Sequence, residues 1–247
     1  MKRVLFRNIF KLMIGLLLIF TLCVQVLASA AYDTANATSF VFADGGVTVT
    51  EGAYTGYKIK GTALSITEAG VYTVSGSCAN GTIVVKKNVT GVTLILDGLT
   101  LKASATAPIT CNKGSGVNIV AAAGSVNHLE DDQYNNDDTY TDEEMYPDIE
   151  NAVIKCKDGS DVTISGSGTI NVTANGKNGV KGGYDLYEDD DDGNATDKLL
   201  STASLTIEEV TLNIVCNVND GLKADNELNI LSGNITVSAA DDGIKSD

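Results

Sequence analysis

The chain lacks tryptophan and holds only two prolines and one histidine among 247 residues. No catalytic triad, zinc site or phosphate loop can be assembled around the single histidine, His128. The absence of tryptophan weakens any expectation of a flat aromatic platform for sugars. No long segment shows the 3.6-residue period of a helix, whereas short runs of Thr, Val, Ile and Asn recur. These features indicate an all-β chain.

Basic residues are also scarce, with 17 Lys and Arg against 32 Asp and Glu, so the formal net charge is −15. Four of the basic residues lie before residue 30, and their removal would take the charge from −15 to −19. Nucleic-acid partners are disfavoured, because phosphate binding requires Lys and Arg. A surface this acidic favours cations and neutral polymers as partners.

Residues 1–30 have the pattern of a secretory signal peptide. A basic start is followed by an uncharged apolar run from Leu12 to Leu27 and by the small residues Ala28-Ser29-Ala30. The apolar run has about 16 residues, whereas a membrane-spanning helix needs about 20. We therefore expect cleavage rather than an uncleaved anchor. The mature protein is expected to be a monomer, secreted or at the cell surface, with no membrane association after cleavage.

A six-residue motif is repeated near the end of the chain. Asp-Gly-Leu-Lys-Ala-Asp at 220–225 recurs as Asp-Gly-Ile-Lys-Ser-Asp at 242–247, and 178–183 is a related copy. One apolar residue of each copy, and the equivalent residue of similar segments upstream, is taken as an anchor. Successive anchors lie 26, 45, 26, 42 and 22 residues apart. The two long spacings each contain an acidic insert, so the underlying period is about 22–26 residues. The anchors are Ile83, Ile109, Ile154, Val180, Leu222 and Ile244.

Two further alternating segments follow the anchors, of which 92–96 and 170–174 are examples. Alternation of apolar and polar residues is typical of half-buried strands. The pattern predicts a right-handed parallel β-helix (β-solenoid) with about 22–26 residues per coil and three strands per coil. A β-sandwich is the alternative, but it does not predict the same motif at an interval of one coil.

The predicted organisation has three parts. Residues 1–30 are the signal peptide, 31–62 are lead-in strands that cap the N-terminal end, and 63–247 are the parallel β-helix. Acidic inserts occupy 128–150 and 184–197. Because the chain stops directly after a copy of the motif, we expect further coils beyond Asp247.

Four cysteines remain after the predicted cleavage, which invites disulfides in an exported chain. We favour small buried side chains, because cysteine packs like a small hydrophobic residue. Cys111 and Cys156 are expected at equivalent inward positions of neighbouring coils, so they are the pair to test for a bridge.

Stacking of the motif copies would place carboxylates above carboxylates on the outer face. Two carboxylates about 5 Å apart repel by roughly 3 kcal/mol at an effective dielectric constant of 20. A bound cation could relieve this repulsion, and calcium fits best because it binds six to eight oxygen ligands. Lys181, Lys223 and Lys245 could instead neutralise the carboxylates, and the residues leave both interpretations open.

The two acidic inserts hold or adjoin five of the nine tyrosines. Exposed rings on loops of a rigid scaffold are common ligand contacts. The alternative is that the inserts are solvated loops. The predicted ligand-binding residues are Tyr184, Tyr187, Lys223 and Lys245.

Six segments follow one another in a characteristic order: Val71 to Gly76, Val92 to Gly98, Ala107 to Ile109, Asn151 to Ile154, Gly166 to Ile170 and Asp241 to Ile244. This order resembles the bacterial carbohydrate-binding domain family of exported parallel β-helices. The resemblance implies a fold similar to that of calcium-dependent polysaccharide lyases, and binding of cellulose or of acidic sugars such as polygalacturonate. It also implies calcium held by Asp220, Asp225, Asp241, Asp242 and Asp247. The copy at 178–183 departs from this pattern, with Asn and Gly in place of the two outer Asp.

Three functions are compatible with these features. The first is non-catalytic, calcium-dependent binding of plant cell-wall polysaccharide. The second is a structural or adhesive surface solenoid, and the third is a polysaccharide lyase with Lys223 or Lys245 as the base. Neighbouring Asp residues favour the charged ammonium, which argues against a lysine base. We therefore favour the binding function and assign no catalytic residue.

Overall fold

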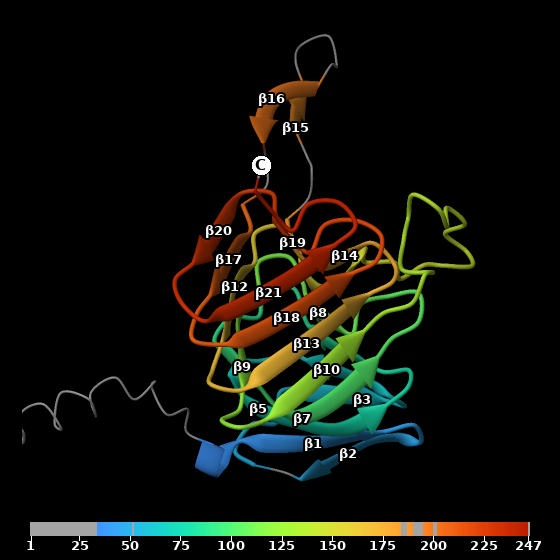
Figure 1. Cartoon of the computed structure of the whole chain (residues 1–247). Helices are drawn as coiled ribbons and strands as arrows, with labels where there is room; N and C mark the ends of the chain where they lie inside the picture. Colours follow the sequence, from blue (N-terminus) through green and yellow to red (C-terminus); the bar gives the residue numbers. More distant parts are fainter. Residues whose placement is uncertain (1–33, 51, 184–186, 190–194, 200–201, 247) are drawn as a thin grey trace, which may run out of the picture. The chain divides into compact units, whose positions relative to one another are not determined.

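Nearly all of the described chain consists of β-strands joined by short turns (Figure 1). The structure is a computed structural model that describes residues 34–50, 52–183, 187–189, 195–199 and 202–246. The predicted signal peptide lies outside these residues. In the part of the chain that the structure describes, no helix is long and apolar enough to cross a membrane.

Two large sheets contain most of the strands, and their central pairings are parallel. The 12-stranded sheet has the order β20-β17-β12-β9-β7-β10-β13-β18-β21, with β1, β2 and β5 joined to it through β7. Its strands are β1 (Thr38–Ala43), β2 (Gly46–Thr50), β5 (Gly70–Cys78), β7 (Val92–Lys102), β9 (Gly116–Ala121), β10 (Val126–Glu130), β12 (Asp161–Ser165), β13 (Thr169–Ala174), β17 (Ser204–Ile207), β18 (Thr211–Cys216), β20 (Glu227–Ile230) and β21 (Asn234–Ala239).

The 8-stranded sheet has the order β22-β19-β14-β11-β8-β6-β4-β3. Its strands are β3 (Tyr57–Lys60), β4 (Ala63–Ile66), β6 (Thr82–Val85), β8 (Ile109–Cys111), β11 (Ala152–Cys156), β14 (Asn178–Gly182), β19 (Leu222–Ala224) and β22 (Ile244–Ser246). Two more strands, β15 (Tyr187–Asp189) and β16 (Ala195–Leu199), form a separate antiparallel pair, and a short 3-10 helix, η1 (Thr34–Asn36), precedes β1.

The predicted right-handed parallel β-helix with three strands per coil is wrong. The all-β chain forms two large sheets instead of three strand faces. The alternating segment predicted at 92–96 is part of a longer strand, because β7 continues through Asp97 and Gly98 to Lys102. Gly98 has a φ of +74°, and the register with β5 shifts at this point, so the residues form a bulge. A bulge bends a strand without ending its sheet, so β9 and β10 both pair with β7 in one sheet.

The antiparallel pairings lie near the start of the described chain. β1 pairs antiparallel with β2 and parallel with β5, and β3 pairs antiparallel with β4. These strands include most of the predicted lead-in segment, 31–62. Phe40 and Phe42 are buried on β1 and extend the apolar core toward this end.

The parallel register within the 8-stranded sheet aligns apolar side chains of neighbouring strands. Ile109 pairs with Ile83 on one side and Ile154 on the other, and Val180 pairs with Leu222. All of these side chains are fully buried. Because successive residues of a strand point to opposite faces, this register places one apolar set in a continuous core.

The cysteines belong to this core. Cys111 pairs with Cys156, and Cys216 pairs with Ala174, so each occupies the inward position that the alternation predicted. Cys78, Cys111, Cys156 and Cys216 are free and buried.

Thiol titration tests this packing. The four cysteines should be nearly unreactive in the folded chain lacking residues 1–30, because burial excludes the reagent. After denaturation without a reductant, four thiols should react. A count of two would contradict the structure and indicate a Cys111–Cys156 bridge.

Candidate functional site

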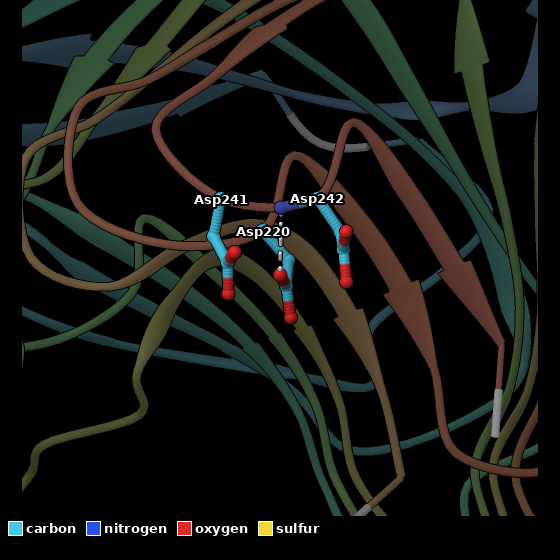
Figure 2. A group of neighbouring side chains, drawn as sticks. All are labelled: Asp220, Asp241 and Asp242. Atoms are coloured by element: carbon cyan, nitrogen blue, oxygen red, sulfur yellow. Dashed lines mark hydrogen bonds between the residues drawn. The ribbon is translucent and has the colours of Figure 1, made fainter.

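Three carboxylates converge where the chain enters β19 and β22 (Figure 2). Asp220 lies before β19, and Asp241 and Asp242 lie before β22. Each carboxylate offers one oxygen, and these three oxygens lie within 4.8 Å of one another. Asp220 is buried, whereas Asp241 and Asp242 are exposed. We refer to these residues as the aspartate trio.

Backbone hydrogen bonds between neighbouring motif copies build this arrangement. Gly221 N donates to Asp242 O at 2.9 Å, and Asp242 N donates to Asp220 Oδ1 at 3.2 Å. Gly221 is required by space, because a Cβ there would lie 2.3 Å from Cγ1 of Val237 and 2.8 Å from Gly243 O. The close backbone approach therefore brings one copy's carboxylate beside the next copy's turn.

The aspartate trio has the chemistry of a site for a hard cation. Carboxylates are preferred calcium ligands, and three of them so close repel one another unless a positive charge is present. Lys245 Nζ lies 3.7 Å from Asp242 Oδ2 and supplies one such charge. Of the two expected ways of neutralising the carboxylates, the structure contains the lysine, and the calcium ion stays a prediction.

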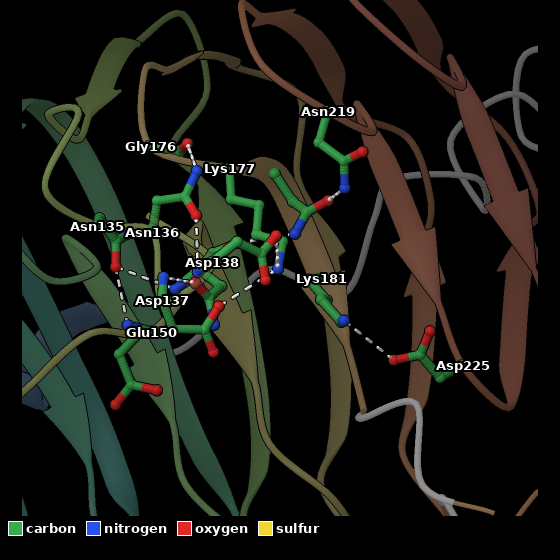
Figure 3. A network of polar contacts seen from close by, with 12 residues as sticks. Asn135, Asn136, Asp137, Asp138, Glu150, Gly176, Lys177, Lys181, Asn219 and Asp225 are labelled. Atoms are coloured by element: carbon green, nitrogen blue, oxygen red, sulfur yellow. Dashed lines mark hydrogen bonds and ion pairs between the residues drawn. The ribbon is translucent and has the colours of Figure 1, made fainter. Parts of the chain in front are cut away.

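The other predicted metal ligands are placed differently. Asp225 is fully buried, and one of its oxygens lies 3.2 Å from Lys223 Nζ. Its other oxygen lies 3.6 Å from Lys181 Nζ (Figure 3). It is absent from the group of carboxylates at the aspartate trio. Asp247 lies outside the described residues.

The predicted ligand-binding residues also differ in their surroundings. Lys223 is buried beside Asp225, whereas 35% of the Lys245 side chain is exposed. Tyr184 lies outside the described residues, and Tyr187 is described only as part of the backbone of β15. Among these four, Lys245 is the one that the structure places next to the aspartate trio.

Lys155 lies in register with Lys181, Lys223 and Lys245, which was not predicted from the sequence. The register pairs Lys155 with Lys181, Lys181 with Lys223, and Lys223 with Lys245. The signal was present, since Ile154-Lys155-Cys156 has the same apolar-Lys-small pattern as Val180-Lys181-Gly182. Lys155 Nζ donates to Gly183 O at 2.6 Å. Burial, and next the charge of Lys181, lower the pKa of Lys155 to about 8.

The first acidic insert starts later than predicted, because residues up to Glu130 belong to β10. The loop from Asp131 to Asn151 connects β10 to β11, and it is the yellow-green segment at the right of Figure 1. Asp131 anchors it: Oδ1 accepts hydrogen bonds from Asn175 N at 2.7 Å and Gly176 N at 3.1 Å. Burial raises the pKa of Asp131 to about 6, although these hydrogen bonds act to lower it.

Three tyrosines of this loop pack together. The ring centroids of Tyr134 and Tyr140 lie 4.9 Å apart, those of Tyr140 and Tyr146 5.2 Å, and those of Tyr134 and Tyr146 5.7 Å. Beside them is a hollow of about 530 Å³. Sequence reasoning noted these rings in the insert but selected Tyr184 and Tyr187. The hollow is lined by Asp137, Tyr140, Thr141, Glu143, Tyr146, Pro147 and Ile149.

Comparison with known proteins assigns the family. Residues 60–191 and 190–247 match the family described as "Carbohydrate-binding domain-containing protein". The chain belongs to the carbohydrate-binding domain family. A protein of the same description from Acetivibrio thermocellus is 34% identical over 125 residues, which are 50% of this chain and 41% of that protein. The chain thus matches less than half the length of this relative.

A solved structure has a fold similar to that of this chain. It is described as the polysaccharide lyase-like protein from C. thermocellum, gadolinium derivative. The TM-score is 0.64 at 27% sequence identity, and the match covers 85% of this chain and 74% of that chain. The carbohydrate-binding family expected from the sequence is therefore confirmed.

The buried Lys155 predicts how stability depends on pH. Its pKa in the folded chain is about 8 against an ordinary 10.5, so between these values the unfolded chain binds more protons. The free energy of unfolding should therefore rise as pH increases from about 8 to 10.5, by at most ~3 kcal/mol, and this gain should be lost toward pH 8. Urea unfolding across this range should show the rise in the wild type and a smaller rise in Lys155→Met.

The matched control is Lys86→Met, because Lys86 is an exposed lysine that follows β6. It should keep the wild-type rise. An equal rise in Lys155→Met and the wild type would show that another group is responsible.

Proposed function

We propose that this protein binds plant cell-wall polysaccharide without converting it chemically, and that calcium held by the aspartate trio takes part. Family membership supports the carbohydrate partner. The observation that carries the calcium-dependent part is the convergence of Asp220, Asp241 and Asp242, with three oxygens within 4.8 Å. The polysaccharide is an acidic one such as polygalacturonate, or cellulose.

The trio fits a calcium ion in size and in chemistry. Calcium–oxygen distances are about 2.3–2.6 Å, so ligands on opposite sides of the ion lie about 5 Å apart. The largest separation in the trio falls within this span. Asp220 Oδ1 is held by the Asp242 backbone, and Asp241 and Asp242 contribute the other two carboxylates. Calcium also needs further oxygens, which water or a sugar can supply.

Charge explains why a cation would matter for acidic sugars. The formal charge of −15 repels a polyuronate, and a bound divalent cation reverses the local sign. Asp225 is a poorer candidate ligand, because its two oxygens face Lys181 and Lys223.

The environment of the lysines favours binding over catalysis. Lys223 is buried against Asp225, and Lys245 lies beside Asp242. Each of these two lysines is thus engaged by a carboxylate of the chain rather than presented alone to a ligand. We further propose that the protein is secreted or held at the cell surface, on the basis of the signal-peptide pattern in residues 1–30.

Replacing Asp241 by Asn tests the cation site. The change keeps the size of the side chain but removes one charged ligand, so calcium affinity should fall on the order of tenfold, since affinity follows ligand charge. Isothermal titration of the chelator-treated chain with calcium provides the measurement. Retention on immobilised polygalacturonate, with calcium and with EDTA, reports the functional consequence.

Asp97→Asn is the control, because Asp97 is an exposed carboxylate at the β7 bulge. It should leave calcium affinity unchanged. Equal affinities for wild type and Asp241→Asn, or retention on polygalacturonate that EDTA does not alter, would contradict the calcium proposal. Formation of absorbing unsaturated uronate in the presence of calcium would show lyase activity and overturn the non-catalytic part.

A further inference from the structure

The loop between β10 and β11 carries a cluster of partly exposed tyrosines. Tyr134, Tyr140 and Tyr146 form one aromatic cluster, in which the Tyr134 and Tyr146 rings are nearly parallel at 12°. Tyr134 is 36% exposed, and the Tyr140 and Tyr146 side chains are partly exposed. Rings that only filled the interior of a loop would be more fully buried.

The hollow beside these rings combines two kinds of contact. Tyr140, Tyr146 and Pro147 provide apolar surface, and Asp137 and Glu143 provide carboxylates. A hexose ring has an apolar C–H face and hydroxyl groups around its edge, so it needs both kinds. The volume of about 530 Å³ lies within the range of about 300–1,000 Å³ that is usual for small-molecule sites.

The loop is held in place by contacts at its base. Asn135 Oδ1 accepts hydrogen bonds from Glu150 N at 2.8 Å and Asn151 N at 3.0 Å, which closes the loop across its ends (Figure 3). Lys177 Nζ lies 3.3 Å from Asp137 Oδ1 and 2.7 Å from Asp138 Oδ2. A site on a braced loop loses less conformational entropy when a ligand binds.

The negative charge of the loop favours an uncharged polysaccharide over an acidic one. Its exposed acidic side chains would repel a uronate. Within the described residues, the aspartate trio is the one group of three such side chains arranged for a metal ion, so the loop shows no comparable means of reversing its charge. Partial burial acts to raise the pKa of Asp137, but Asn151 and Lys177 outweigh it and the pKa is lowered. The exposed acidic residues are Asp137, Asp138, Asp142, Glu143, Glu144 and Asp148.

We propose that this tyrosine pocket, formed by Tyr140, Tyr146, Asp137, Glu143 and Thr141, binds an uncharged hexose polysaccharide independently of calcium. Tyrosine rings contact the C–H faces of the sugar, and the carboxylates accept hydrogen bonds from its hydroxyls. The inference rests on the proposed polysaccharide-binding function. It assigns neutral glycans to the tyrosine pocket and leaves acidic glycans to the aspartate trio.

Titration of the full chain with cellohexaose, an uncharged probe, tests the pocket. Because the chain lacks tryptophan, the fluorescence of its nine tyrosines can be followed, a change that is lost in Tyr146→Ala would come from the pocket, and calorimetry gives the affinity. Wild type should bind equally well with calcium and with EDTA. Tyr146→Ala should weaken binding by about tenfold through loss of ring contact. Met145→Ala is the matched control, because Met145 is 66% exposed on the same loop but does not line the hollow, and it should bind like wild type.

Thr141→Arg separates a ligand site from a merely structural cluster. It fills the hollow and leaves all three rings in place, so it should abolish cellohexaose binding without lowering the melting temperature. Unchanged cellohexaose binding in this variant would overturn the proposal, even if Tyr146→Ala fails to fold.

Hexagalacturonate with calcium distinguishes the two proposals. It should bind Tyr146→Ala and Thr141→Arg as it binds wild type. Binding of hexagalacturonate but not of cellohexaose by wild type would refute the tyrosine pocket and leave the proposed function intact. Binding of neither probe would count against both.

Discussion

The in-register pairing of parallel strands is the constraint on which the rest of the structure depends. Parallel neighbours related by one motif copy place equivalent residues side by side, as Lys223 pairs with Lys181 and Lys245. Inside the molecule this arrangement is favourable, because Ile109 beside Ile154 buries apolar surface. The same register also brings like charges together, as in the row from Lys155 to Lys245, and opposite charges such as Asp225 compensate for them. Such compensation is found at Asp225, which contacts two lysines, and at the aspartate trio, where Lys245 contacts Asp242.

The same motif meets different surroundings at successive strands. Lys223 has paired neighbours on both sides, is buried and contacts Asp225. Lys245 lies on β22, which ends the sheet order among the described strands, and it is more exposed. Asp220 is likewise buried while Asp242 is exposed. One repeated motif thus supplies both a buried ion pair, at Asp225, and a member of the aspartate trio, at Asp242.

Departure from regular pairing supplies the second type of surface. The loop from Asp131 to Asn151 is inserted between β10 and β11. The strand pairing is preserved across it, since β11 still pairs with β8 in register. Asp131 and Lys177 tie the loop to residues around β13 and β14. The loop can therefore carry aromatic and acidic side chains that the strand register would not accommodate. Regular strands and a braced loop together provide the two chemically distinct surfaces at which we propose that polysaccharide binds.

The sequence by itself determined the all-β class, the family and most strand partners, because alternation and motif spacing are local properties that survive folding. It also indicated that Asp220 and Asp242 would be neighbours, since parallel register follows from the motif interval. It could not show that β7 continues past Gly98, because a glycine with positive φ serves a bulge as well as a turn. Only the tertiary structure decided which charged side chains meet, and so separated Asp225, enclosed with two lysines, from Asp220, which converges with Asp241 and Asp242. Contacts between side chains of different strands depend on how the chain is folded in space, and no local pattern contains that information.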